Sequence, residues 1–304
     1  MRNILVGSRG SALALAQTKL VVDSLKRHVP GLRFRIVPIK TSGDTLHEKA
    51  EVAVDNKSLF TKEIEDSILK GEVDVAVHSM KDLTTDIPAG LTIAAVPERA
   101  DHRDALISRS KQKFQHLPGG ARIGTSSPRR KAQLLAARSD LQIVDMHGNV
   151  DTRLRKLRSG QCDAIILAAA GLDRLGLERH VSELLSTQIM LPAVGQGALA
   201  VQSRESDNEV IELLSHIEHG PTRRAIEAER AFARRLGANC RTPIAAYART
   251  IGPKLEMDGL VGSLDGRKVM RAKLVSENPD AGKVGEELAD SLLKQGAQSV
   301  LEAQ

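Results

Sequence analysis

The sequence predicts an α/β protein built from two similar lobes, followed by a small α+β domain at the C-terminus. Strand-like and helix-like segments alternate through the first two thirds of the chain, interrupted by crossing segments at 97–104 and 189–197. After Gly220 the order changes to a long helix, three strand-like runs and a further helix. Alternation favours mainly parallel sheets with helices on both faces, whereas grouped strands favour an α+β domain.

The first lobe begins with a buried strand over 3–7. Ser11 then caps an apolar-periodic helix, and Pro30 and Gly31 end it. The segments expected to complete this lobe are a strand over 33–39, a helix over 59–69, and strands over 73–78 and 91–96.

The second lobe repeats this order after the polar crossing. Its expected segments are a strand over 122–125, a helix from Pro128, a strand over 141–144, a helix over 152–157 and a strand over 163–167. The crossing at 189–197 then leads back to the first lobe. Two lobes joined in this way are expected to enclose a cleft.

The C-terminal domain combines one long helix with a group of strands. Its expected segments are a helix over 222–236, strands over 244–250, 255–262 and 268–276, and a helix over 282–294. The predicted domain bounds are 1–97 plus 198–216 for the first lobe, 103–191 for the second, and 220–304 for the third domain.

The composition limits the classes of function. Hydrophobic residues make up 41% and charged residues 27% of the 304-residue chain, which is typical of a globular protein. Aromatic residues make up 2%, so platforms for stacking nucleic acid bases are scarce. The net charge of +6 fits either an ordinary solvated surface or an anionic ligand, and the positions of the arginines decide between them.

The cysteines and the first residues favour a reducing, cytoplasmic setting. Cys162 and Cys240 have neither a disulfide pattern nor zinc-ligand spacing, so we expect no metal site. The start MRNILVGSRG lacks an apolar signal region, and no run of the chain reaches the roughly 18–20 apolar residues that span a membrane.

The most informative motif is GTSSPRR at 124–130. Hydroxyl residues precede Pro128 at a helix start, and Arg129 and Arg130 follow within the first turn. Cations are unfavourable at the positive end of a helix unless an anion lies nearby. The motif therefore favours a bound carboxylate or phosphate over a capped surface helix.

Other strand-to-helix turns carry similar side chains. Arg9 precedes Ser11, Asp82 follows the strand over 73–78, Arg153 follows His147, and Arg174 lies at a further turn. In open α/β sheets ligands bind beyond the carboxyl ends of strands. Repeated arginines at such turns indicate one cleft for several carboxylates, although an aspartate after a strand is often only a helix cap.

Cys240 and Cys162 lie in different settings. Cys240 lies in a loop beside Arg241, where thiolate character is favoured, whereas Cys162 begins an apolar run. The sequence alone leaves open whether Cys240 is a nucleophile or an ordinary loop thiol.

Taken together, these segments resemble the porphobilinogen deaminase family. The matching stretches are SRGSALALAQ, LFTKEIE, DVAVHSMKDL, GTSSPRR, GNVDTRLRKL, DAIILAAAGLDRLGL, LPAVGQGALA, AERAF and the Cys240 loop. The resemblance implies two lobes similar to those of periplasmic binding proteins, with the active site between them. It also implies a monomer. The composition and the missing apolar segments already predict a cytoplasmic protein without nucleic acid or membrane partners.

The resemblance further implies an enzyme that uses a dipyrromethane cofactor, held by a thioether to Cys240. Four porphobilinogen units are added with loss of ammonia, and hydrolysis releases hydroxymethylbilane. Every pyrrole carries an acetate and a propionate, which suits bidentate arginine.

The resemblance also assigns the site residues. Asp82 matches the catalytic carboxylate. The cofactor would bind Cys240, Ser79, Lys81, Thr125, Ser126, Ser127, Arg129, Arg130, His147 and Gly148. The substrate would bind Arg9, Ser11, Phe60, Arg153, Arg174, Gln196 and Lys57.

Three segments depart from the family pattern. His147 replaces an arginine, which predicts weaker binding there and a sharper loss of activity as pH rises. Residues 53–58 replace a Gly-rich lid and keep one of its two lysines, Lys57. Ala238 and Asn239 replace two glycines before Cys240, and asparagine is the residue expected to accept a left-handed backbone there.

Two alternatives remain at the level of sequence. One is an anion-binding protein of the same two-lobed fold without turnover, and the other is a nucleic acid binder. The missing signal region, the third domain and Asp82 count against the first, and the scarce aromatics count against the second.

Overall fold

The computed structural model describes residues 3–43, 60–239, 242–277 and 280–302 of the chain. It divides into two compact units. The first comprises residues 1–100 and 198–223, and the second comprises residues 101–197 and 224–304. The second unit therefore contains both the second lobe and the C-terminal domain. The sequence-based division into three domains stays a prediction.

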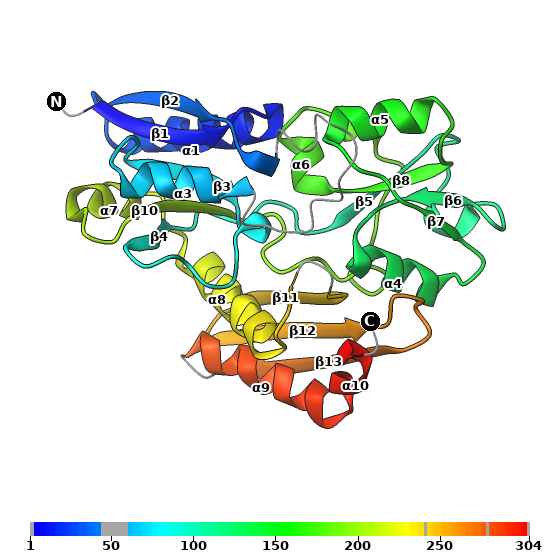
Figure 1. Ribbon diagram of the computed structural model, residues 1–304. Coiled ribbons are helices and arrows are strands. Elements are labelled where there is room, and N and C mark those ends of the chain that lie inside the picture. Colours follow the sequence, from blue (N-terminus) through cyan, green and yellow to red (C-terminus); the bar gives the residue numbers. More distant parts are fainter. Residues whose placement is uncertain (1–2, 44–59, 240–241, 278–279, 303–304) are drawn as a thin grey trace. The chain divides into compact units, whose positions relative to one another are not determined.

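The first unit is a five-stranded mixed sheet with helices (Figure 1). Its strand order is β2-β1-β3-β10-β4, in which β1 pairs parallel with β2 and β3, while β10 runs antiparallel to β3 and β4. Its elements are β1 (Asn3–Arg9), α1 (Ala12–His28), β2 (Arg33–Ile39), α3 (Lys62–Leu69), β3 (Val75–Ser79), the 3₁₀ turn η2 (Met80–Asp82), β4 (Leu91–Ala95), β10 (Leu199–Arg204) and α7 (Asn208–Ser215).

The sheet of the second lobe has the same pattern of strand directions, although its antiparallel strand comes first in the sequence of the lobe and that of the first lobe comes last. Its order is β7-β6-β8-β5-β9, with β6 parallel to β7 and β8, and with β5 antiparallel to β8 and β9. Its elements are β5 (Asp104–Ser108), η3 (Phe114–His116), β6 (Arg122–Gly124), α4 (Pro128–Ala137), β7 (Gln142–Val144), α5 (Val150–Arg158), β8 (Ala164–Ala168), α6 (Ala169–Asp173), η4 (Glu178–His180) and β9 (Glu183–Leu184).

The C-terminal domain is a three-stranded antiparallel sheet covered by helices. Its elements are α8 (Gly220–Arg235), β11 (Ile244–Ile251), β12 (Lys254–Gly262), β13 (Val269–Ser276), α9 (Ala281–Lys294) and α10 (Ala297–Glu302). Two α/β lobes followed by an α+β domain are the fold class predicted from the sequence, and this prediction is confirmed.

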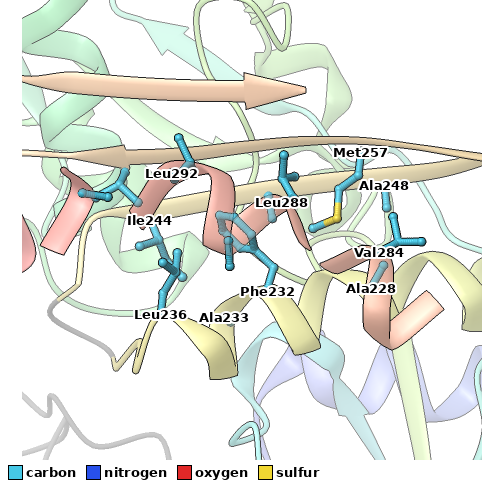
Figure 2. Packing of buried hydrophobic residues seen from close by; sticks show 14 of the residues in the cluster. Ala228, Phe232, Ala233, Leu236, Ile244, Ala248, Met257, Val284, Leu288 and Leu292 are labelled. Carbon is cyan, nitrogen blue, oxygen red and sulfur yellow. The ribbon is translucent and has the colours of Figure 1, made fainter. Parts of the chain in front are cut away.

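The core of this domain lies between its helices and its sheet. Figure 2 shows Phe232 of α8 beside Leu288 of α9 and Met257 of β12, and all three are buried. The helices cross closely because residue 285 is glycine. A Cβ atom at that position would collide with the carbonyl oxygen of Ala228. Any larger residue at 285 would therefore force α8 and α9 apart.

Helix α4 connects the second lobe to the C-terminal domain. It contacts both β12 and β13, and a Cβ atom at Gly262 would lie 3.2 Å from that of Ala132. This packing places the helix that carries Arg129 and Arg130 in the same compact unit as the domain that contains Cys240. No helix in the described ranges is both long and apolar enough to cross a membrane.

Candidate active site

The GTSSPRR motif forms the start of α4, as the sequence predicted. Ser127 is the N-cap, and its side chain accepts a hydrogen bond from the backbone N–H of Arg130 at 3.4 Å. Pro128 occupies the first turn, where its missing N–H costs nothing. Thr125 is buried and accepts from the backbone N–H of Ser127 at 3.2 Å, which fixes the loop that leads into the helix.

The two arginines of this motif are buried, and both bind Asp104 at the start of β5. Nη1 of Arg129 lies 2.7 Å from one carboxylate oxygen of Asp104, and Nη2 of Arg130 lies 2.7 Å from the other. Asp104 is fully buried. Burial alone would raise the pKa of its carboxyl, but the two guanidinium groups hold that pKa well below its usual range.

Asp104 is not among the site residues predicted from the sequence, which places it in the polar crossing at 97–104. An acidic residue directly before the apolar run 105–107 was the available signal, because a buried carboxylate requires a cationic partner. The anion beside the helix start is thus a residue of the protein itself. The unusual placement of the two arginines is explained without a ligand.

Arg153 of α5 adds a third cation to this region without an acidic partner. Its Nε donates to the carbonyl oxygen of Gly148 at 2.8 Å, and none of the described residues forms an ion pair with it. Burial, together with the charge of Arg130, lowers the pKa of Arg153 to about 10. Arg129 and Arg130 share the carboxylate of Asp104, and Arg153 adds a further positive charge that acts on Arg130.

His147 lies at the edge of the same region. It is exposed, and its Nε2 is 3.3 Å from the hydroxyl of Ser126, which in turn accepts from the backbone N–H of Met146 at 2.8 Å. Gly148 follows with φ +113°, and a Cβ atom there would meet the side chain of Thr152. The turn at this point therefore requires glycine.

The remaining predicted residues of the second unit bind the return crossing. Nη2 of Arg174 donates to the carbonyl oxygen of Gly197 at 2.7 Å, and Nε2 of Gln196 donates to that of His102 at 2.9 Å. Burial lowers the pKa of Arg174, and the neighbouring Asp173 opposes this shift. The two side chains thus hold the crossing in place in this structure.

In the first lobe, the predicted residues gather at the ends of β1 and β3. The Arg9 guanidinium lies 4.3 Å from the centre of the Phe60 ring, a cation–π distance. Ser11 caps α1 by accepting from the backbone N–H of Ala14 at 3.3 Å. The hydroxyl of Ser79 accepts from Nε2 of Gln17 at 2.8 Å.

Asp82 and Lys81 form the 3₁₀ turn after β3, and both are half-buried. The backbone N–H of Met80 anchors this turn by donating to the carbonyl oxygen of Ala198 at 3.0 Å. The turn therefore presents Asp82 at the carboxyl end of a central strand, where α/β sheets place their ligands.

A buried imidazole lies behind Asp82. His78 of β3 is 6% exposed, and its Nε2 has no hydrogen-bond partner in the part of the chain that the structure describes. Burial lowers the pKa of His78 to about 4, against the opposing charge of Asp82. His78 is therefore neutral at physiological pH.

Two predicted residues, Cys240 and Lys57, lie outside the described residues, as do residues 53–58 of the altered lid. Close to Cys240 the left-handed backbone occurs at Gly237, with φ +61°. Asn239 itself does not need the left-handed backbone that asparagine tolerates. Asn239 instead exchanges hydrogen bonds with the Thr242 hydroxyl, at 3.0 Å from its backbone N–H and 3.1 Å to its side-chain oxygen.

Comparison with known proteins gives full-length similarity to one family. Residues 4–212 match the model of the porphobilinogen deaminase dipyrromethane cofactor-binding domain, and residues 224–294 match that of the porphobilinogen deaminase C-terminal domain. The chain is 48% identical over 301 residues to a porphobilinogen deaminase of Syntrophomonas wolfei, covering 99% of this chain and 98% of the relative. A porphobilinogen deaminase of Roseiflexus castenholzii is 48% identical over 302 residues and covers 99% of both.

Solved structures similar to this chain include two bacterial proteins with low sequence identity. A YaeC-family lipoprotein from Enterococcus faecalis is 17% identical with a TM-score of 0.43, covering 72% of this chain and 93% of its own. A probable amino-acid ABC transporter extracellular-binding protein from Bacillus subtilis is 12% identical with a TM-score of 0.43, covering 71% and 89%. Both TM-scores lie below 0.5.

Proposed function

This chain belongs to the porphobilinogen deaminase family, and we propose that it is an enzyme that joins four porphobilinogen units into the linear tetrapyrrole hydroxymethylbilane. Each unit loses one ammonia as its new carbon–carbon bond forms, and one water releases the product. The observation that carries this proposal is the ordered match of both family models over nearly the whole chain.

The chain contains the family's dipyrromethane cofactor-binding domain. We infer that the cofactor is attached through a thioether to the sulfur of Cys240. When bound, the cofactor supplies the free pyrrole carbon at which chain growth begins. Its acetate and propionate groups fit the surplus of guanidinium over carboxylate around Arg153, because an unbalanced buried cation is stabilised by an anionic ligand.

The resemblance to the family suggests which residues would hold the cofactor side chains. The residues assigned to this role are Ser79, Lys81, Thr125, Ser126, Ser127, Arg129, Arg130, His147 and Gly148. In this structure the hydroxyls of Ser127 and Thr125 accept backbone N–H groups, and their own O–H groups are left to donate to a carboxylate. Nε and Nη2 of Arg129 have no acceptor among the described residues and can serve the same purpose.

Asp82 is the catalytic residue of this proposal. Loss of ammonia from porphobilinogen leaves positive charge on the departing pyrrole unit, and a carboxylate beside it stabilises that charge. The carboxylate also accepts the proton that the pyrrole carbon loses as the new bond forms. The half-buried position of Asp82 after β3 supports this role, because partial exclusion of water strengthens its interaction with a cation.

Incoming substrate would be bound mainly by cations. The residues assigned to it are Arg9, Ser11, Phe60, Arg153, Arg174, Gln196 and Lys57. The contact of Arg9 with the Phe60 ring supports this assignment, because it places a guanidinium group at the carboxyl end of β1, where α/β sheets bind their ligands. We propose that the protein acts as a monomer in the cytoplasm.

The proposal is tested by intact-mass measurement of the purified protein with Cys240→Ser and Cys162→Ala variants. We expect the wild type to carry the mass of two linked pyrroles and to react with Ehrlich's reagent. Cys162 is buried in the second lobe, so Cys162→Ala should keep the adduct, whereas Cys240→Ser should lose it. An unmodified wild type that consumes no porphobilinogen would instead support an anion-binding protein without turnover.

A further inference from the structure

The buried carboxylate of Asp104 lies where four parts of the second lobe meet. It begins β5 and binds two side chains of α4, which also reach β8 and the return crossing. We propose that Asp104 is a positioning residue of the active site, which sets the guanidinium planes of Arg129 and Arg130 for the carboxylates of the pyrrole chain. This inference rests on the proposed function.

Each guanidinium is held from two directions. Nη1 of Arg129 donates to Asp104 at 2.7 Å and to the carbonyl oxygen of Leu191 at 2.8 Å. Nε and Nη2 of Arg130 donate to the same oxygen of Asp104 at 3.0 and 2.7 Å, and its Nη1 donates to the carbonyl oxygen of Ile166 at 2.9 Å. A planar group fixed at two points cannot rotate, so its remaining N–H groups keep one direction.

The charge balance distinguishes this cluster from an ordinary structural ion pair. Elsewhere in the same lobe, Arg122 and Asp163 form a one-to-one pair in which both side chains are more than a third exposed. Asp104 faces two buried arginines, and the charge of Arg130 also acts on Arg153. One carboxylate orients these cations without cancelling their charge, which is the arrangement that binding a polyanion requires.

The hydrogen bonds that hold the crossing at 189–197 support the same interpretation. Leu191, whose carbonyl oxygen binds Arg129, is itself fixed by Gln133 of α4, with N–H···O distances of 2.7 and 3.0 Å. Gln133 is buried one turn beyond Arg129. The backbone acceptor is therefore as rigid as the carboxylate, and the direction of Arg129 is set by groups that have no contact with solvent.

The test compares Asp104→Asn with Leu141→Ala, a core truncation in the same lobe that leaves every bond of Asp104 intact. For each purified, folded protein, intact mass gives the fraction of chains that carry the two-pyrrole adduct. Steady-state kinetics with porphobilinogen then give KM and kcat for the loaded fraction, and thermal unfolding gives the stability. Asparagine keeps the shape of the side chain and removes its charge.

We expect Asp104→Asn to lower the loaded fraction or raise KM by about tenfold, the usual effect of losing a charge-assisted hydrogen bond. Leu141→Ala should lower thermal stability while loading and KM stay within about twofold of wild type, since it creates a cavity and moves no ligand group. If Asp104→Asn does not fold, Asp104→Glu takes its place. It keeps the charge, moves the carboxylate by one methylene, and should show the same loss.

Two results would overturn the inference. In one, the folded Asp104 variant loads and turns over like wild type. In the other, Leu141→Ala loses as much cofactor loading as an Asp104 variant of the same thermal stability, which would make the role of Asp104 purely structural. A wild type without adduct would be a separate failure, because it would remove the proposed function itself.

Discussion

The sheets of the two lobes share one pattern of strand directions, but the lobes bury different sets of polar groups. Both have three parallel strands followed by an antiparallel strand and an edge strand. The first lobe buries a neutral imidazole, His78, and a carboxamide, Gln202, which donates to Glu65 at 3.1 Å. The second lobe buries Asp104 with two arginines. Strand order therefore does not determine the electrostatics of a lobe.

The difference in buried charge between the lobes follows from the first residue of the antiparallel strand. In the second lobe the antiparallel strand begins with Asp104, whereas the equivalent strand of the first lobe, β10, begins with Leu199. A carboxylate at that position makes it possible to bury two guanidinium groups at the start of α4. We propose that the first lobe contributes the catalytic carboxylate, Asp82, and the second lobe contributes most of the cationic binding surface.

The proposed catalytic role of the first lobe is tested by Asp82→Asn, which should have the largest effect. We expect kcat to fall by about 100-fold or more, because the amide can neither stabilise a cation as well nor accept a proton. We expect the variant to keep the two-pyrrole adduct, which intact mass measures independently of turnover. Asp23→Asn, at an exposed position of α1 in the same lobe, is the control and should leave kcat unchanged. Equal activity of the two variants would remove the catalytic role from the first lobe.

Arg153→Met tests the excess charge of the second lobe. Burial lowers the pKa of Arg153, so in the Cys240→Ser background, which is expected to lack the cofactor anions, removing the charge should stabilise the protein by about 1–3 kcal/mol. In the otherwise wild-type enzyme, the same change should raise KM for porphobilinogen by about tenfold through the loss of a carboxylate contact. Thermal unfolding and steady-state kinetics measure the two effects.

The matched control is Arg122→Met, which removes a cation that already has a carboxylate partner, Asp163. It should lower stability or leave it unchanged, with KM unaffected. A stability loss in Arg153→Met would mean that this cation is balanced within the protein, and the comparison of the lobes would fail.

The lobes should also differ in their response to acid. The pKa of His78 is about 4 in the folded protein and near 6.5 when unfolded, so below pH 6.5 the unfolded state binds more protons. Stability should therefore fall by about 3 kcal/mol as pH drops from 6.5 to 4. The pKa of Asp104 lies below this window, so its ion pairs remain intact through it.

Thermal unfolding between pH 7 and pH 4 measures this difference in wild type, His78→Gln and His28→Gln. His78→Gln should flatten the dependence, whereas His28→Gln, at the exposed end of α1, should leave it unchanged. If His78→Gln keeps the full acid sensitivity, the buried imidazole of the first lobe is not its cause.

His147→Arg is expected to have the smallest effect. The added guanidinium offers a second donor at the edge of the cationic region, so KM should fall by about two- to threefold. An imidazole ordinarily loses its charge near pH 6.5, and arginine does not, so activity of the variant should decline less above pH 7. A pH profile of kcat/KM for both proteins measures this. Superimposed profiles would show that His147 takes no part in binding.

Much of this structure was predictable from local sequence pattern. The cap Ser11, the motif around Ser127 and Pro128, and the three strands of the C-terminal domain all follow from residues close in sequence. Strand β10 was not predicted. It directly follows the Gly-rich crossing, and its partner β3 lies more than a hundred residues away, so only the assembled sheet identifies it.

The candidate site shows the same limit. Arginines at helix starts were correctly singled out, but their partner Asp104 lies 25 residues before Arg129 and belongs to a strand that the sequence did not predict. The local pattern predicts an anion beside these arginines, and the carboxylate that binds them in the structure belongs to Asp104 of the same chain. The charge balance around Arg129 and Arg130 can be judged only when the pairing of strands distant in sequence is known.

The most direct test of the whole account is the stoichiometry of the reaction in a single vessel. Purified protein is incubated with porphobilinogen, and ammonia, remaining porphobilinogen and linear tetrapyrrole are measured together. We predict one ammonia for each porphobilinogen consumed and one hydroxymethylbilane for every four. Porphobilinogen that is bound but not consumed, or ammonia released without a tetrapyrrole, would contradict the account.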